Sequence, residues 1–330
     1  MSTEVSLPKR LKSLLRTRLG AHDSRLATRE SQRFMPGSLI RRKIVQAIAF
    51  GFVWLAGLTA VVALAWIIGR VVWEGWPVVN LEFLTTRPRG GVSGEGGMST
   101  TIVTTLYLVV LTLAIATPLG VGAAVFLVEY AGEVQRENRL VGILISVART
   151  GVEILAGVPS IIFGLFGFAL FVVALNRFTG GFSLLSAGLS GACLVLPVII
   201  RTSEEALLSV PRSYREGSLA LGATKWQTIV QVVVPAATPG IITGVVLSVG
   251  RIISETAIFW VTLGGSFHLP TSLQHAGRSM ALHLFVLATE TRAFQKAMGV
   301  ALVLVVTIVV LNLVINYTSR TLAARAMGRK

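Results

Sequence analysis

The stretch "REGSLALGATKWQTIVQVVVPAA", residues 215–237, is a polar, glycine-interrupted segment between two very apolar parts of the chain. Gly222 follows an apolar run, as a left-handed helix end does. Thr224 and Gln227 have the spacing of a capping box that opens a second helix. The pattern predicts two short surface helices joined at Gly222, with Pro235 ending the second.

The rest of the chain is unusually apolar. Of its 330 residues, 53% are hydrophobic and only 14% are charged, whereas a soluble domain carries about 25% charge. A membrane-spanning helix needs roughly 20 apolar residues. We therefore expect an all-α membrane protein with six transmembrane helices, in residues 44–68, 101–128, 143–175, 182–200, 239–263 and 297–315.

The third of these stretches is too long for one straight helix, since its length at about 1.5 Å per residue would reach roughly 50 Å. It contains "AGVPS", residues 156–160. The proline in this word removes a backbone donor and breaks a helix. The sequence predicts an oblique helix up to Ala156 and a span that begins at Ser160.

The formal net charge is +15, and eleven of the thirty Lys and Arg residues lie within residues 1–43, directly before the first apolar stretch. Most of the others fall in loops on the same side of the predicted membrane. Positive loops stay in the cytoplasm, so both termini are predicted to be cytoplasmic. This placement favours membrane lipid as a partner and argues against nucleic acid.

The predicted organisation has four parts. They are a basic cytoplasmic arm (1–43), the first transmembrane helix with a glycine-rich external loop (44–100), a core (101–316) and a cytoplasmic tail (317–330). We interpret the external loop as a flexible connector. The core carries the longest cytoplasmic loop, residues 201–236, which includes the opening segment.

Ionisable residues inside spans are costly and are therefore candidates for function. Arg251 and Glu255 are four residues apart in the fifth span, and Arg149 and Glu153 have the same spacing near the break in the third. One interpretation is a structural ion pair that lowers the cost of burial. The other is an anion pathway, because an arginine offers a planar fork of donors to a tetrahedral oxyanion.

The sequence offers few residues for metal binding, catalysis or ATP hydrolysis. His268, His275 and His283 share one predicted external loop, but their spacing is not that of a helical metal pair, and we interpret them as surface residues of a docking loop. No catalytic residues, metal site or cofactor are predicted. The chain also lacks a G-x-x-x-x-G-K-[ST] loop, so it cannot hydrolyse ATP by that route.

Residues 216–235 resemble the loop of ABC importer permeases, whose consensus is E-A-A-x3-G-x9-I-x-L-P. Glu216, Gly222 and Pro235 fall on the pattern, while Gly217 and Ser218 replace the two alanines. The resemblance implies a type I ABC importer permease (MetI-like) fold in which this loop forms coupling helices that dock on a separate ATPase.

The same resemblance implies roles for single residues. Glu216 would pair with ATPase side chains, and Gly222 would allow the sharp turn between the helices. The packing contacts with the ATPase would be Ala220, Leu221, Ala223 and Trp226. ATP would be bound by the partner subunits.

Longer segments, among them "ILAGVPSIIFGLFGF" (154–168) and "PAATPGIITGVVLSVGRIISETA" (235–257), are similar in sequence to the PstA-type permeases of phosphate importers. In that family an Arg and a Glu of the word R-x-x-G-E-T are implicated in phosphate passage. They match Arg251 and Glu255 here, with Ser254 in place of the glycine. The resemblance implies a PstC-type second permease, a PstB-type ATPase dimer and a PstS-type external phosphate-binding protein.

Three alternatives stay open at this point. The cargo could be another oxyanion, such as phosphonate, sulfate or molybdate. An ion-driven secondary transporter or a channel would need no ATPase dock, so the two-helix loop would be surplus. That loop could also be an amphipathic surface hairpin without a partner.

Overall fold

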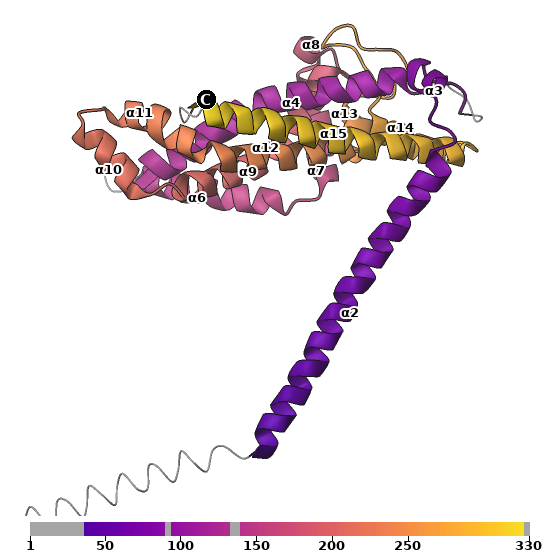
Figure 1. The fold of residues 1–330 in the computed structure, drawn as a ribbon. Helices are drawn as coiled ribbons and strands as arrows, with labels where there is room; N and C mark the ends of the chain where they lie inside the picture. Colours follow the sequence, from indigo (N-terminus) through magenta and orange to yellow (C-terminus); the bar gives the residue numbers. More distant parts are fainter. Residues whose placement is uncertain (1–35, 90–93, 133–138, 327–330) are drawn as a thin grey trace, which may run out of the picture. The chain divides into compact units, whose positions relative to one another are not determined.

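The computed structural model describes residues 36–89, 94–132 and 139–326, whose regular structure is helical apart from one isolated bridge between Pro88 and Gly96 (Figure 1). The chain divides after Ile68 into two compact units. The helices, with π-helical segments marked η, are α2 Pro36–Gly75, α3 Leu81–Thr85, α4 Ser99–Val125, η1 Phe126–Tyr130, α6 Arg139–Ala156, α7 Ser160–Gly167, η2 Phe168–Ala174, α8 Asn176–Thr179, α9 Leu184–Leu208, α10 Arg212–Ala220, α11 Lys225–Thr228, η3 Ile229–Val233, α12 Val234–Ser254, α13 Ala257–Thr262, α14 Met280–Thr289 and α15 Phe294–Ala326.

Within the described residues, five helices are long and apolar enough to cross a membrane, and a bent pair supplies a sixth if it counts as one span. The five are Arg41–Gly75, Ser99–Tyr130, Leu184–Leu208, Lys225–Ser254 and Phe294–Thr318, and the pair is Leu140–Ala156 with Ser160–Ala174. Each predicted stretch overlaps one of these elements. The prediction of an all-α membrane protein is confirmed, with five to six candidate spans in the described residues.

The break in the third span lies where the sequence predicts it. Helix α6 ends at Ala156, α7 begins at Ser160, and the two are bent by 111°. Pro159 between them is extended, with ψ of 138°. Its missing N–H and fixed φ end one helix and start the next.

The fifth span differs from its prediction at both ends. Helices α11, η3 and α12 run without interruption from Lys225 to Ser254. Pro235 does not end the second surface helix: it follows directly after the π-helical segment η3, inside the continuous helix. At the other end, α12 stops at Ser254 and Glu255 is extended (ψ 126°), so the predicted continuous span 239–263 is broken before α13.

The loop predicted as a flexible connector is folded where the structure describes it. Asn80 caps α3 by accepting a hydrogen bond from the backbone of Phe83. The N–H of Met98 donates to the carbonyl of Phe83 at 2.8 Å, and both side chains are buried in the main core. These contacts hold the start of α4 against the loop.

The core lies among α4, α9 and α12. Helix α4 packs along α9, and α12 packs on both α9 and α15 (Figure 1). The main core includes Leu108, Val195, Ile199, Val249 and Phe259. A second core cluster joins the end of α4, the end of α9 and the start of α12 through Ala124, Leu207, Val210, Val233 and Ala237. This second cluster lies next in sequence to α10 and α11.

Glycines let α9 and α12 approach closely. A Cβ added at Gly240 would lie 2.5 Å from the Cβ of Ala206. One added at Gly244 would overlap the Thr202 hydroxyl and lie 2.9 Å from the Thr202 Cβ. Small residues of this kind allow helix backbones to pack without side chains between them, as is common in membranes.

The three histidines of the predicted docking loop do not share one environment. His268 and His275 are exposed, but His283 lies in α14 and is only 5% exposed, so its interpretation as a surface residue is wrong. Burial first, and then the charge of Arg278, lower the pKa of His283 to about 4. Its Nδ1 has no hydrogen-bond partner among the described residues.

We expect Gly244→Ala to destabilise the subunit by about 1–3 kcal/mol, because the added methyl forces α9 and α12 apart. Gly250 lies on the same helix with no atom within 4 Å of its added Cβ. Gly250→Ala should therefore leave stability unchanged or raise it by up to about 1 kcal/mol through helix propensity. Thermal unfolding in detergent measures both, and equal effects of the two variants would contradict the close approach.

The lowered pKa of His283 predicts a loss of stability in acid. As pH falls below about 6.5, His283 becomes protonated in the unfolded chain but stays neutral in the folded chain. The free energy of unfolding therefore falls as pH drops from about 6.5 to about 4. The full loss from this group is on the order of 3 kcal/mol. We expect the midpoint of thermal unfolding of His283→Leu to depend less on pH across this range than that of the wild type. His268→Leu should show the same pH dependence of the midpoint as the wild type. An unchanged pH dependence in His283→Leu would show that other groups set it.

Candidate functional site

Helix α10 begins after Pro211, whose extended backbone (ψ 142°) starts the helix without a side-chain cap. It ends at Ala220, and Gly222 then adopts φ of +86°. The N–H of Gly222 donates to the carbonyl of Leu219, and that of Ala223 donates to Ser218. Only glycine takes this left-handed conformation at little cost, so the predicted corner at Gly222 is present.

Helix α11 starts with the predicted capping box. The Thr224 hydroxyl accepts from the Gln227 N–H, and the Gln227 side chain accepts from the Thr224 N–H. The hydroxyls of Ser218 and Thr228 are 2.9 Å apart and join α10 to α11. We call α10, the Gly222 corner and α11 (residues 212–228) the coupling unit. Its second helix continues directly into α12.

The tip of the coupling unit is exposed and apolar. Leu221 is 91% exposed and Trp226 is 63% exposed, and Ala220, the last residue of α10, is also exposed. Glu216 is exposed on α10, whereas Ala223 is half-buried. Clustered apolar side chains beside a charge on an exposed tip are typical of a protein contact surface.

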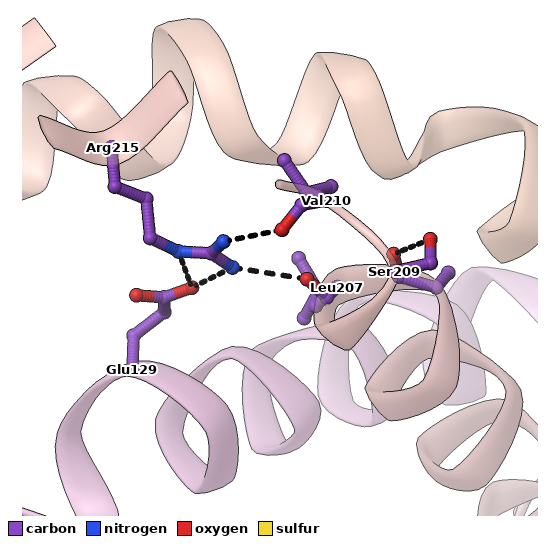
Figure 2. Close-up of polar contacts among 6 residues, drawn as sticks. Glu129, Leu207, Ser209, Val210 and Arg215 are labelled. Atoms are coloured by element: carbon purple, nitrogen blue, oxygen red, sulfur yellow. Dashed lines mark hydrogen bonds and ion pairs between the residues drawn. The ribbon is translucent and has the colours of Figure 1, made fainter. Parts of the chain in front are cut away.

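Sequence reasoning missed the ion pair that anchors α10. Arg215 donates from Nε (3.0 Å) and Nη2 (2.7 Å) to Oε1 of Glu129, from Nη1 to the carbonyl of Val210 (2.8 Å) and from Nη2 to the carbonyl of Leu207 (2.9 Å) (Figure 2). The side chains of Arg215 and Glu129 are only 20% and 10% exposed. Their separation of 86 residues leaves no sequence spacing that could reveal the pair.

Arg149 and Glu153 each pair with a residue of α9 and not with one another. Nη2 of Arg149 is 2.7 Å from Oε1 of Glu204, and Nη1 of Arg201 is 3.6 Å from Oε1 of Glu153. Arg201 also lies 3.6 Å from Glu205. These charges line an open pocket of about 220 Å³ between α6 and α9.

Arg251 and Glu255 lie where two helix breaks meet. Glu255 ends α12, and both the side chain of Ser160 at the start of α7 and the charge of Arg251 favour its carboxylate form. A Cβ added at Gly164 would lie 3.2 Å from the Cα of Ile258, so α7 packs closely on α13. Both Arg251 and Glu255 are half-buried.

Ser254, which stands in place of the glycine in the R-x-x-G-E-T word, does not crowd this site. Its hydroxyl is exposed and donates to the carbonyls of Gly250 (3.0 Å) and Arg251 (3.1 Å) in its own helix. Of the two, the Arg251 carbonyl is among the last four of α12, which lack the usual helical partner. The serine therefore supplies a donor to one carbonyl at the break.

Comparisons place the chain among transport proteins. Residues 116–327 match the family described as "Binding-protein-dependent transport system inner membrane component". The chain is 34% identical over 280 residues to the phosphate transport system permease protein PstA 1 of Mycobacterium tuberculosis (strain CDC 1551 / Oshkosh), covering 83% of this chain and 88% of that protein. It is 30% identical over 290 residues to the probable ABC transporter permease protein YqgI of Bacillus subtilis (strain 168), with coverage of 83% and 95%.

A solved structure agrees in fold. The bacterial alginate ABC transporter in complex with an alginate pentasaccharide-bound periplasmic protein superposes with a TM-score of 0.58 at 16% identity, covering 82% of this chain and 95% of that chain. The likeness concerns the arrangement of helices alone, and it confirms the predicted type I ABC importer permease fold.

The family match contains the coupling unit, both helix breaks and all four predicted intramembrane charges. An ion-driven transporter or a channel is therefore set aside. The chain belongs to the binding-protein-dependent transport system inner membrane components, and it is a multi-pass, non-catalytic permease subunit of an inner-membrane ABC importer that works with ATPase and binding-protein partners.

Proposed function

We propose that this subunit moves inorganic phosphate from a PstS-type external binding protein to the cytoplasm, together with a PstC-type permease and a PstB-type ATPase dimer. The identity to a protein named a phosphate transport permease, over most of both chains, supports this cargo. The observation that carries the proposal is the position of Arg251 and Glu255 at the junction of two broken helices.

The chemistry of this junction suits a tetrahedral oxyanion. The guanidinium of Arg251 presents a planar fork of donors, which matches two phosphate oxygens. Glu255 is the competing anion: Arg251 and the side chain of Ser160 interact with it when no phosphate is present. An arriving phosphate takes over these donors, and repulsion from Glu255 keeps its binding weak enough for release.

We assign Arg149 and Glu153 to the same pathway, at the pocket between α6 and α9. Each is held by a partner of opposite charge on α9. Rearrangement of the exposed Arg201–Glu153 pair costs little, because a surface ion pair is worth about 0–1 kcal/mol. The pocket walls can thus exchange partners as an anion passes.

The coupling unit is proposed as the dock for the ATPase dimer. Glu216 provides a charged contact, and Leu221 and Trp226 provide apolar side chains that fill a groove on the partner. Ala220 and Ala223 are small enough to let the partner surface approach the corner at Gly222. Closure of the ATPase dimer on ATP then moves the coupling unit, and differential contacts in the two states open one side of the pathway.

We expect Arg251→Ala to lower the uptake of labelled phosphate by about 10- to 100-fold, because charge-assisted hydrogen bonds to the anion are lost. The complex should still copurify with its ATPase. Arg177→Ala, which removes an exposed arginine on α8, is the control and should transport normally. Normal uptake in Arg251→Ala would show that Arg251 has a structural role only. Uptake of sulfate in place of phosphate by the wild type would contradict phosphate as the cargo.

We expect Glu216→Lys to weaken binding of the ATPase and to lower ATP-driven uptake by about tenfold or more, since a like charge replaces an attractive contact at the dock. Glu216→Gln keeps the size of the side chain and should give an intermediate loss. Copurification of the ATPase and uptake in proteoliposomes measure the two effects. Wild-type binding and uptake in Glu216→Lys would remove Glu216 from the dock.

A further inference from the structure

The π-helical end of α4, η1, is held by both helices of the coupling unit. Arg215 of α10 binds Glu129 of η1, and Nζ of Lys225 at the start of α11 lies 4.5 Å above the ring centre of Tyr130. We propose that Glu129 and Tyr130 are the point at which movement of the coupling unit enters α4, with Arg215 and Lys225 as the positioning residues. The inference rests on the proposed docking of the ATPase at the coupling unit.

The guanidinium of Arg215 joins three elements at once. Beyond Glu129, it donates to the carbonyl of Leu207 in the last turn of α9 and to that of Val210, just after the end of α9 (Figure 2). Because both charged side chains are mostly buried, salt screens the pair weakly, and loss of one partner leaves a charge without its counterion. Such a contact resists displacement of α10 relative to η1.

Lys225 makes the second contact from the other side of the Gly222 corner. A lysine ammonium over a tyrosine face is a cation–π interaction. The hydroxyls of Ser218 and Thr228 join the two helices of the coupling unit at 2.9 Å. The unit therefore reaches two consecutive residues of η1 from two helices that are tied to each other.

Chain connectivity gives these contacts their mechanical role. The coupling unit is bonded to α9 through residues 209–211, and it continues directly into α12. Helix α4 has no such covalent link to the unit. A push on the unit is thus transmitted to α9 and α12 along the backbone, but to the end of α4 through side chains.

The π-helical geometry of η1 is consistent with a segment that takes up movement of the coupling unit. A π-helical turn has a wider hydrogen-bond register than an α-helix and is frequent at functional sites. Just before it, Ala124 of α4 packs in the second core cluster with Leu207 and Val233. Movement of η1 is therefore passed into α4 at the point where that helix contacts both α9 and the start of α12.

The test uses the complete transporter in proteoliposomes, with inorganic phosphate, its binding protein and ATP. The measured quantity is phosphate imported per ATP hydrolysed. We expect Glu129→Ala to lower this ratio by about tenfold and Tyr130→Leu by about threefold, within the usual range of coupling between sites. Copurification of the ATPase should be unchanged, since neither residue lies in the exposed tip.

Conservative variants separate transmission from local folding. Glu129→Asp and Tyr130→Phe keep the carboxylate and the ring, so both should stay within about twofold of the wild type. A fall of uptake and hydrolysis in equal proportion would overturn the proposal, as would wild-type ratios in Glu129→Ala and Tyr130→Leu. If Glu129→Ala does not assemble, Tyr130→Leu decides, because it leaves the buried ion pair intact.

A second readout does not depend on the cargo. Gly122 is an exposed residue of α4 with no atom within 4 Å of an added Cβ, so a fluorophore attached to Gly122→Cys in a Cys193→Ser background reports on α4. Trapping the wild-type complex with ATP and vanadate should shift its emission, and Glu129→Ala should abolish the shift. A full shift in Glu129→Ala would overturn transmission through η1. Failure of the wild type to import phosphate would contradict only the proposed cargo, and failure to bind the ATPase only the dock.

Discussion

Lipid offers the backbone no hydrogen-bond partner, so each N–H and C=O group in a span must be satisfied within the protein. Continuous helices meet this requirement, and every departure from a helix needs packed protein or a polar side chain around it. The two departures at Pro159 and Glu255 lie close together: the side chain of Ser160 lies near Glu255, and α7 packs on α13 at Gly164. The breaks are tolerated because they face one another.

The same constraint places the polar junction and the coupling unit in different parts of the subunit. The polar junction lies where α7, α12 and α13 meet, whereas the coupling unit lies between the end of α9 and the start of the candidate span Lys225–Ser254, with Leu221 and Trp226 exposed. Helices α9 and α12 join these places along the chain, and the contact of Arg215 with Glu129 ties the end of α4 to the coupling unit. At Gly240 and Gly244, α12 packs closely on α9, so we expect these two helices to move together.

Local features were predictable because local chemistry decides them. Pro159 ends a helix wherever it occurs, Gly222 takes a positive φ that other residues avoid, and Thr224 with Gln227 closes a capping box within one turn. The prediction failed at Pro235, because the helix continues through the π-helical segment η3 into α12, and a proline inside a helix can bend it without ending it.

By itself, the sequence determined the apolar spans, the break at Pro159, the corner at Gly222 and membership of the ABC importer permeases. These follow from solvent preference and from backbone limits within a few residues. The tertiary structure decided which charges meet: Arg149 with Glu204, Arg201 with Glu153 and Arg215 with Glu129. Ion pairs between helices depend on how those helices pack, and the i, i+4 spacing within one helix carries no information about a partner many residues away.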